Sequence, residues 1–392
     1  MSQPSANPER GKAVSDLDRA HVFHSWSAQS QISPLPVAGG EGSYFWDFNG
    51  KKYLDFSSQL VFTNIGHQHP KVIKAIQDQA QLYTTVAPQH ANEARGEAAK
   101  RITDRAGKSH NKVFFTNGGA DAVENAIRMA RLHTNRHKIL SFYRSYHGNT
   151  TAAIASTGDP RRWPNEYAYG HVHFFGPYLY RSPFWADSLE QECQRALDHL
   201  EQVITFEGPA TIAAILIESV VGTAGVLLPP DGYLEGVRAL CDKYGINWIA
   251  DEVMSGFGRT GKWFAYQHWA AEPDLIVFAK GVNSGYVPLG GVIISDEIAA
   301  TFNDRAFPGG LTYSGHPLAT AAAVATIDVM SEEKIVENAA HIGESVIKPL
   351  LNELMAKHKV IGEVRGKGVF WALDLVTDRT TRAPLAPYGA SS

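Results

Sequence analysis

The chain has 392 residues, 44% of them hydrophobic, and its 36 Lys and Arg nearly balance 40 Asp and Glu, which gives a formal net charge of −4. This length and apolar content predict a large buried core, in two or more domains or in one α/β domain with an appendage. Because the cations are scattered along the chain, composition disfavours nucleic acid as a partner.

Cysteine usage and apolar runs indicate the compartment. Cys193 and Cys241 are the only cysteines and show no CxxC spacing, which makes a reducing cytoplasm the default. The N-terminus is polar and lacks the apolar centre of a secretory signal. No apolar run approaches the roughly 20 residues that cross a bilayer. We therefore expect a cytoplasmic protein without a membrane partner.

The first part of the chain is expected to form a small sheet that follows a disordered leader at residues 1 to about 16. Residues 33–56 predict short strands, with a two-residue hairpin signal at Asn49 and Gly50. His67 and His69 form an HxH pair in a loop, but no third ligand lies near, so a loop-capping role is favoured and no metal site is assigned. Residues 72–83 have helical periodicity.

A strand at 112–116 leads through Asn117, Gly118 and Gly119 into a long amphipathic helix. Strand, glycine pair and helix in this order present free backbone N–H groups and a helix N-terminus to a phosphate. An ordinary tight connection between a strand and a helix has the same pattern, so both interpretations stay open at this point.

A strand at 138–143 is followed by Tyr146, His147 and Gly148. An aromatic side chain at the end of a strand could lie over a planar cofactor, although most such tyrosines only pack. Residues 159–183 are rich in aromatic residues, Pro and Arg without periodicity, and we expect an ordered excursion that lines a cleft or an interface.

The following segments alternate between helix and strand up to about residue 294, which predicts a mostly parallel sheet covered on both faces. Residues 189–206 and 233–244 are predicted helices, and residues 212–217 form a buried strand that ends at Glu218. Further helices are predicted at 317–330 and 335–357, before strand and turn return at 364–375. That return suits a small C-terminal domain.

The most informative stretch places charged residues after two short buried strands. Residues 246–250 are followed by Asp251 and Glu252, and residues 275–279 are followed by Lys280. Ligands of open parallel sheets bind outside the carboxyl ends of strands, so these side chains can face one crevice. An enzyme that uses pyridoxal phosphate needs such a lysine to carry the cofactor and an aspartate opposite its ring nitrogen. A salt bridge or two solvated loop charges is the simpler alternative.

The glycine-rich loop at residues 256–262 matches two nucleotide-binding patterns, GxGxxG and GxxxxGK, and both are disfavoured. The second pattern needs Ser or Thr next, and position 263 is Trp. The first pattern needs its glycine directly after the strand and an acidic residue about 20 positions later, and neither condition is met.

Together these residues resemble the class III, or omega, aminotransferases, pyridoxal phosphate enzymes of fold type I. The similarity rests on Trp-Ile-Ala-Asp-Glu-Val at 248–253, on Gly256, Phe257, Arg259 and Gly261, on Asp-Leu-Ile at 274–276, and on Ala279, Lys280 and Gly285. Lys280 lies 29 positions after Asp251. It extends to residues 116–124, 146–148, 218 and 311–317, and so covers nearly the whole chain.

The resemblance implies a fold, a division of the chain and a partner. The fold would be α/β, with a large domain around a mostly parallel sheet and a small domain built from both chain ends. Residues 1–68 would form the N-terminal segment and part of the small domain, 69–314 the large cofactor-binding domain, and 315–392 the C-terminal small domain. The active unit would be a homodimer with shared active sites.

The resemblance also implies roles for individual residues. Lys280 would carry pyridoxal 5′-phosphate and move a proton between substrate and cofactor, while Asp251 would keep the ring nitrogen protonated. The residues expected to contact the cofactor are Gly118, Gly119, Ala120, Tyr146, His147, Glu218, Asp251, Val253, Lys280 and, from the partner subunit, Thr312. Leu60 and Val61 align with positions that flank the substrate, and Val61 stands where an aromatic residue is common, which predicts a roomier pocket.

The reaction implied is a two-stage ping-pong transfer of an amino group from an amine or amino acid to an oxo acid such as pyruvate. Ala120 replaces a frequent Ser and Ser219 a usual Pro, but the backbone donors remain. Family members continue past Ser392 and supply an arginine for the substrate carboxylate there, so we expect the chain to be incomplete. An aminomutase or decarboxylase of the same superfamily, or a non-catalytic scaffold, are the alternatives.

Overall fold

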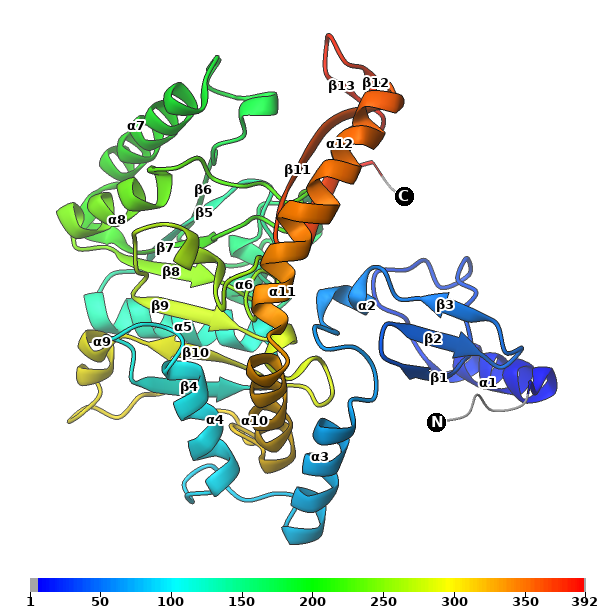
Figure 1. Cartoon of the computed structure of the whole chain (residues 1–392). Coiled ribbons are helices and arrows are strands. Elements are labelled where there is room, and N and C mark those ends of the chain that lie inside the picture. Colours follow the sequence, from blue (N-terminus) through cyan, green and yellow to red (C-terminus); the bar gives the residue numbers. More distant parts are fainter. Residues whose placement is uncertain (1–5, 391–392) are drawn as a thin grey trace.

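The structure, a computed structural model, describes residues 6–390 and contains three β-sheets (Figure 1). A seven-stranded sheet forms the centre, in the order β4-β10-β9-β8-β7-β5-β6. Its strands are β4 (Lys112–Thr116), β5 (Lys138–Phe142), β6 (His171–Phe174), β7 (Ile212–Glu218), β8 (Asn247–Asp251), β9 (Leu275–Phe278) and β10 (Gly290–Ile294). β10 runs antiparallel to β4 and β9, and the remaining pairs are parallel. The predicted α/β class with a mostly parallel sheet is confirmed.

Two small sheets come from the two ends of the described chain. The first contains β1 (Val37–Glu41), β2 (Tyr44–Asp47) and β3 (Lys52–Leu54), and the second contains β11 (Ile361–Lys367), β12 (Phe370–Asp378) and β13 (Ala383–Pro384). Figure 1 shows the first of these sheets set apart from the central sheet, to which it is joined through a short turn, α2 (Ser58–Val61).

Helices cover both faces of the central sheet. Successive residues of a strand point to opposite faces, so a strand that is apolar throughout must be covered on both sides. In β7, Ile215 and Ile217 belong to one hydrophobic cluster, while Ala214 and Leu216 belong to the other. The larger helices are α3 (Pro70–Leu82), α4 (Glu93–Thr103), α5 (Gly119–Thr134), α7 (Leu189–Glu207), α8 (Tyr233–Tyr244) and α10 (Pro317–Glu332). Shorter ones are α6 (Thr151–Ser156), α9 (Asp296–Ala300), α11 (Ile335–Ile342) and α12 (Lys348–Lys357).

The expected disordered leader is wrong for the part of it that the structure describes. Helix α1 spans Pro8–His21, and the Asn7 side chain caps it by accepting a hydrogen bond from the Arg10 N–H at 3.0 Å. Proline in the first turn suits a helix start because its missing N–H would have no partner there. Gly11 packs closely against Phe48, which ties this helix to the N-terminal sheet. Residues 1–5 of the expected leader lie outside the described residues.

Residues 159–183 form the ordered excursion that the sequence predicts. They contain a 3-10 helix at Pro160–Asn165, the edge strand β6 and a second 3-10 turn at Leu179–Arg181. The 3-10 helix packs beside α6, and this brings the Arg161 side chain over the ring of Tyr146, which follows β5.

Candidate active site

The carboxyl ends of β7, β8 and β9 border a cavity of about 490 Å³. Glu218 and Asp251 are direct neighbours across β7 and β8, and Lys280 follows β9 as the first residue of a 3-10 turn, Lys280–Asn283. The cavity is lined by nine of the predicted site residues: Gly118, Gly119, Ala120, Tyr146, His147, Glu218, Asp251, Val253 and Lys280. Asp251 and Lys280, the two charged residues predicted to meet at the strand ends, therefore border one cavity.

Asp251 is held by two donors at the end of β8. Its side chain is almost fully buried, and Oδ1 accepts a hydrogen bond from the Val253 N–H at 3.0 Å. Oδ2 lies 2.7 Å from Nδ1 of His147, which donates to a carboxylate when that ring nitrogen carries the proton. His147 Nε2 is buried and has no hydrogen-bond partner among the described residues. The carboxylate thus has a fixed direction.

Glu218 lies beside this pair and is also buried. Its two oxygens accept hydrogen bonds from the backbone N–H groups of Tyr146, at 3.0 Å, and Gly222, at 2.8 Å. Burial raises the pKa of this carboxyl to about 7, with a further rise from Asp251, although His147 and the two backbone donors oppose it. Through these bonds Glu218 fixes the backbone that carries the Tyr146 ring.

Lys280 has the character of a reactive amine. Burial lowers the pKa of its ammonium group, and Arg161 lowers it further, whereas Asp251 and Glu218 favour the charged form. Its φ is +45°, a left-handed conformation that is costly for a residue with a side chain and that concentrates at functional sites. Nζ has no hydrogen-bond partner within residues 6–390.

Arg161 lies beside the cavity, next to Tyr146, without being one of its lining residues, and no prediction from the sequence named it. Its guanidinium carbon lies 3.6 Å from the centre of the Tyr146 ring, and its side chain pairs with the carboxylate of Asp159. The guanidinium NH1 makes no hydrogen bond to any described residue. The only signal was the arginine-rich composition of residues 159–183, which has no periodicity that could place one side chain in a cleft.

The turn from β4 into α5 presents unused donors to the same cavity. α5 starts at Gly119, and the first N–H groups of a helix have no partner within it. Among the described residues no acceptor takes the N–H of Gly118, Gly119 or Ala120. A Cβ on Gly119 would approach the methyl groups of Val253 to 3.0 and 3.1 Å, so a small residue lets this helix start lie close to the Asp251 loop.

This donor set fits pyridoxal phosphate. The cofactor has a ring nitrogen that an anion favours in its protonated form, an aldehyde that an amine can attack, and a phosphate that suits free backbone donors at a helix N-terminus. Asp251, Lys280 and the start of α5 offer these three partners around one cavity. The orphaned Nε2 of His147 is buried at the same place.

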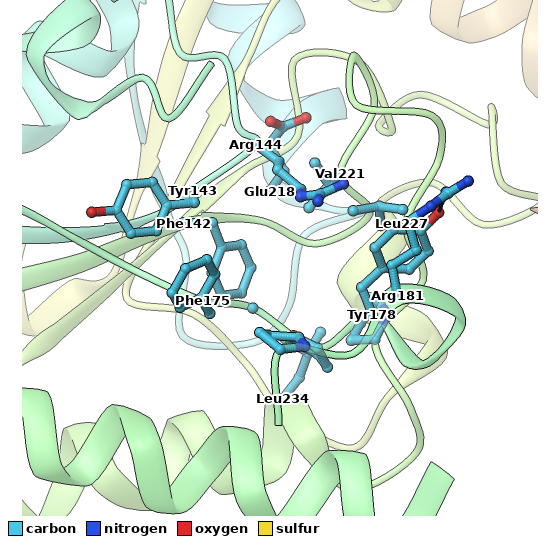
Figure 2. Close-up of a pocket in the computed structure, with 14 residues that line it drawn as sticks. Phe142, Tyr143, Arg144, Phe175, Tyr178, Arg181, Glu218, Val221, Leu227 and Leu234 are labelled. Atoms are coloured by element: carbon cyan, nitrogen blue, oxygen red, sulfur yellow. Dashed lines mark hydrogen bonds between the residues drawn. The ribbon is translucent and has the colours of Figure 1, made fainter. Parts of the chain in front are cut away.

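A second, smaller cavity of about 60 Å³ lies behind Glu218 (Figure 2). Its walls are mainly apolar and include Phe142, Phe175 and Leu234, with Glu218 and Arg144 at the opposite side from Leu234 in the view. This cavity is too small to hold pyridoxal phosphate. Glu218 thus separates the larger cavity from a second internal space.

Three predicted site residues do not line the larger cavity of this single chain. Thr312 is exposed on the loop before α10, and Leu60 is 59% exposed. Val61 packs instead against a separate cluster that contains Val220 and Phe370. Two residues that the sequence reasoning did not name, Trp26 and Phe62, do line the cavity.

The glycine loop at 256–261 has a structural role in the chain. Gly258 and Gly261 have φ of +87° and +85°, and a Cβ on Gly261 would lie 2.7 Å from the Cβ of Ala340 in α11. Glycine is needed there because the loop turns sharply against a helix.

Comparisons with known proteins match the chain over nearly its full length. The family model "Aminotransferase class-III" matches residues 26–389. A crystal structure of taurine:2-oxoglutarate aminotransferase from Bifidobacterium kashiwanohense, in complex with PLP and glutamate, is 45% identical with a TM-score of 0.95, and the match covers 100% of this chain and 87% of that one.

Curated relatives agree with this result. The hypotaurine/taurine–pyruvate aminotransferase of Paracoccus denitrificans is 34% identical over 97% of this chain and 85% of its own length. A 5-aminovalerate aminotransferase of Pseudomonas aeruginosa is 38% identical over 91% and 82%. No helix within residues 6–390 has both the length and the apolar character needed to cross a membrane. The chain belongs to the class III aminotransferases and is a transaminase that depends on pyridoxal phosphate.

Proposed function

We propose that the larger cavity is the active site, that Lys280 and Asp251 are its catalytic residues, and that the transfer runs in two half-reactions. Bound there, pyridoxal phosphate supplies an electron sink for the electron pair released when a C–H bond of the substrate breaks. The phosphate would be held by the backbone donors of Gly118, Gly119 and Ala120. The observation that carries the proposal is the common cavity of Lys280, Asp251 and this helix start.

Each catalytic side chain has a defined task in this proposal. Because burial lowers the pKa of Lys280, more of it is the free amine, which can take a proton from the substrate carbon and would deliver it to a carbon of the cofactor. The Asp251 carboxylate holds a proton on the ring nitrogen, and the His147 and Val253 donors aim it. Glu218 orients the Tyr146 backbone, and the Tyr146 ring and Val253 would contact the two faces of the cofactor ring.

We further propose that the amino donor carries an acid group, as a short aminoalkyl sulfonate or carboxylate does, and that an oxo acid is the acceptor. Arg161 acts electrostatically on Lys280, and its NH1 group has no protein partner among the described residues. A guanidinium binds sulfonates and carboxylates through paired N–H groups. The relatives named for taurine and for 5-aminovalerate act on such acids.

A homodimer is the proposed active unit. Thr312 lies outside the cavity of its own chain, exposed with Tyr313 at 60%, and Phe56 and Leu60 are exposed at 91% and 59%. These exposed side chains support the proposal, because large apolar residues at a surface are often covered by another chain. In the dimer Thr312 would reach the phosphate bound by the partner subunit. The proposed division into 1–68, 69–314 and 315–392 keeps the cavity almost wholly in the middle part.

Replacement of Lys280 tests the proposed site. Lys280→Ala should give a folded protein that has lost transamination and the visible absorbance of the attached cofactor. After borohydride treatment of the wild type, mass spectrometry should find the cofactor on the peptide that contains Lys280. Full turnover by the variant would refute the assignment.

Substrate assays distinguish amino transfer from the alternative activities. With pyruvate or 2-oxoglutarate as acceptor, the protein should convert an external acidic amine and form the new amino acid in equal amount. Turnover of one substrate without an acceptor would favour an aminomutase or decarboxylase, and an inert protein would favour a scaffold. In Arg161→Leu, kcat/KM for the acidic amine should fall roughly 10²-fold while a neutral amine is little affected. An equal loss for both amines would contradict the role of Arg161.

A further inference from the structure

Arg259, in the loop between β8 and β9, is a buried cation without a carboxylate partner among the described residues. Its exposed fraction is 8%, and burial lowers the pKa of the guanidinium to about 10. Its side chain donates to two neutral oxygens, Oγ of Ser58 at 3.4 Å and Oδ1 of Asn64, and Nε has no partner. Burying a cation with only neutral acceptors costs free energy, so this arrangement requires a compensating role.

Both acceptors belong to one strained loop, residues 57–64. Ser58, Gln59 and Val61 have φ of +52°, +56° and +61°, which is unfavourable for residues other than glycine. Such conformations persist only where surrounding contacts enforce them. Asp55 holds the loop from the side of the small sheet, because its Oδ1 accepts the Gln59 N–H at 2.8 Å. Arg259 holds it from the side of the central sheet.

The same loop packs directly on the turn that carries Lys280. Asn64 donates from Nδ2 to the Phe257 carbonyl at 2.7 Å. A Cβ on Gly281 would overlap Asn64, and a Cβ on Gly285 would overlap the Phe62 ring. Phe62 lines the larger cavity together with Gly285 and Lys280. The position of the loop therefore sets one wall of the site.

We propose that Arg259 is a positioning residue that clamps loop 57–64 through Ser58 and Asn64 and so fixes Phe62 against the substrate. This inference rests on the proposed active site. Arg259 touches none of the reacting groups in it. Loss of the clamp should loosen the wall where the substrate binds, and it should leave Lys280, Asp251 and the donors of α5 in place.

The test compares Arg259→Lys, Asn64→Ala and the double variant with Arg136→Lys as a control. Lysine keeps the charge but cannot reach both oxygens, and Asn64→Ala keeps the arginine. Arg136 also bridges segments of the chain, since it donates to the carbonyls of Tyr244 and Gly245 at 3.0 and 2.8 Å, but these lie before β8, at the far end of the strands. The control thus measures the loss of an arginine clamp away from the site.

Kinetics of the holoenzyme provide the first readout. We expect KM for the amino donor to rise roughly 10-fold in Arg259→Lys and in Asn64→Ala, with kcat within about 2-fold of wild type and an unchanged cofactor spectrum. The rise in KM in the double variant should be smaller than the product of the two single effects, because both substitutions remove the Arg259–Asn64 hydrogen bond. Unchanged KM in both single variants, or effects that multiply in the double variant, would overturn the clamp.

Hydrogen exchange provides a second readout that does not depend on turnover. Amides of residues 57–64 should exchange roughly 10-fold faster in Arg259→Lys and Asn64→Ala, and those near residue 136 should not change. In Arg136→Lys the loop should exchange as in wild type. Loop exchange unaltered by the two site variants would contradict the inference. Failure of wild type and Arg136→Lys to transaminate would instead count against the proposed function alone.

Discussion

Replacement of Glu218 by Gln should make the stability of the cofactor-free protein less sensitive to pH. Glu218 is 5% exposed, and burial raises its pKa from 4.5 to about 7. In the unfolded chain the carboxyl loses its proton near its ordinary pKa, whereas the native protein keeps that proton until about neutrality. Between these values the unfolded state binds fewer protons, so the native state loses stability as pH rises.

The size of the effect follows from the shift. The rise of the Glu218 pKa from 4.5 to about 7 corresponds to a loss of up to about 3 kcal/mol in the free energy of unfolding, at about 1.4 kcal/mol per pKa unit. This contribution is fully present below pH 4.5 and is gone above about pH 7. Glutamine does not titrate, so the variant lacks this part of the pH dependence. Its amide also leaves one of the Tyr146 and Gly222 donors without an acceptor, but that cost is the same at every pH.

The assay is denaturant unfolding of wild type, Glu218→Gln and an exposed control, Glu344→Gln, at several pH values from 4.5 to 8. The free energy of unfolding of Glu218→Gln, relative to wild type, should increase by up to about 3 kcal/mol across this range. The control carries the same loss of charge at an exposed position beside Lys348. A Glu218→Gln difference that stays constant with pH, or falls as pH rises, would refute the reasoning.

Three other substitutions probe separate parts of the site. Asp251→Asn should keep its fold and lower kcat roughly 10²–10³-fold in steady-state assays, because it removes the anion that we propose to lie opposite the ring nitrogen; a near-normal kcat would contradict that role. Gly285→Ala should lower the melting temperature and cost about 1–3 kcal/mol, since the new methyl group overlaps Phe62 and φ is +74°; an unchanged Tm would be inconsistent with that packing. Thr312→Val should weaken cofactor binding roughly 10-fold in a cofactor titration if the threonine contacts the partner's phosphate site, and unchanged affinity would count against that contact.

The central sheet, and the part of the cavity that contains Asp251 and Lys280, could be predicted from the sequence because their signals are local. β8 and β9 are short apolar runs between turn residues, and the charged residues that matter follow them directly. In a parallel sheet, strand ends meet at one edge, so Asp251 and Lys280 come together without knowledge of the loops. The glycine pair at the start of α5 follows β4 directly, so its backbone donors could be placed at the same edge in the same way.

The remaining walls of the cavity, and the cation beside it, could not be predicted in this way. Arg161 comes from an aperiodic excursion, and its position over the Tyr146 ring depends on how a 3-10 helix packs beside the Tyr146 loop. Phe62 and Trp26 come from segments far from Lys280 in sequence. The leader was predicted to be disordered because it is polar. Asn7 and Pro8, however, form a helix N-terminal signal, which depends on the order of the residues and not on composition.

The same contrast separates the groups at the strand ends from the walls that loops supply. The carboxylate of Asp251 is buried and already held by two donors, so its direction is set by folding and costs nothing when a ligand binds. Lys280 is likewise fixed at the end of a central strand. Loops outside the sheet, such as 57–64, also border the cavity, and they can change without disturbing the sheet. Substitutions that alter donor preference should therefore be found in these loops, while substitutions at the strand ends should abolish turnover for every donor.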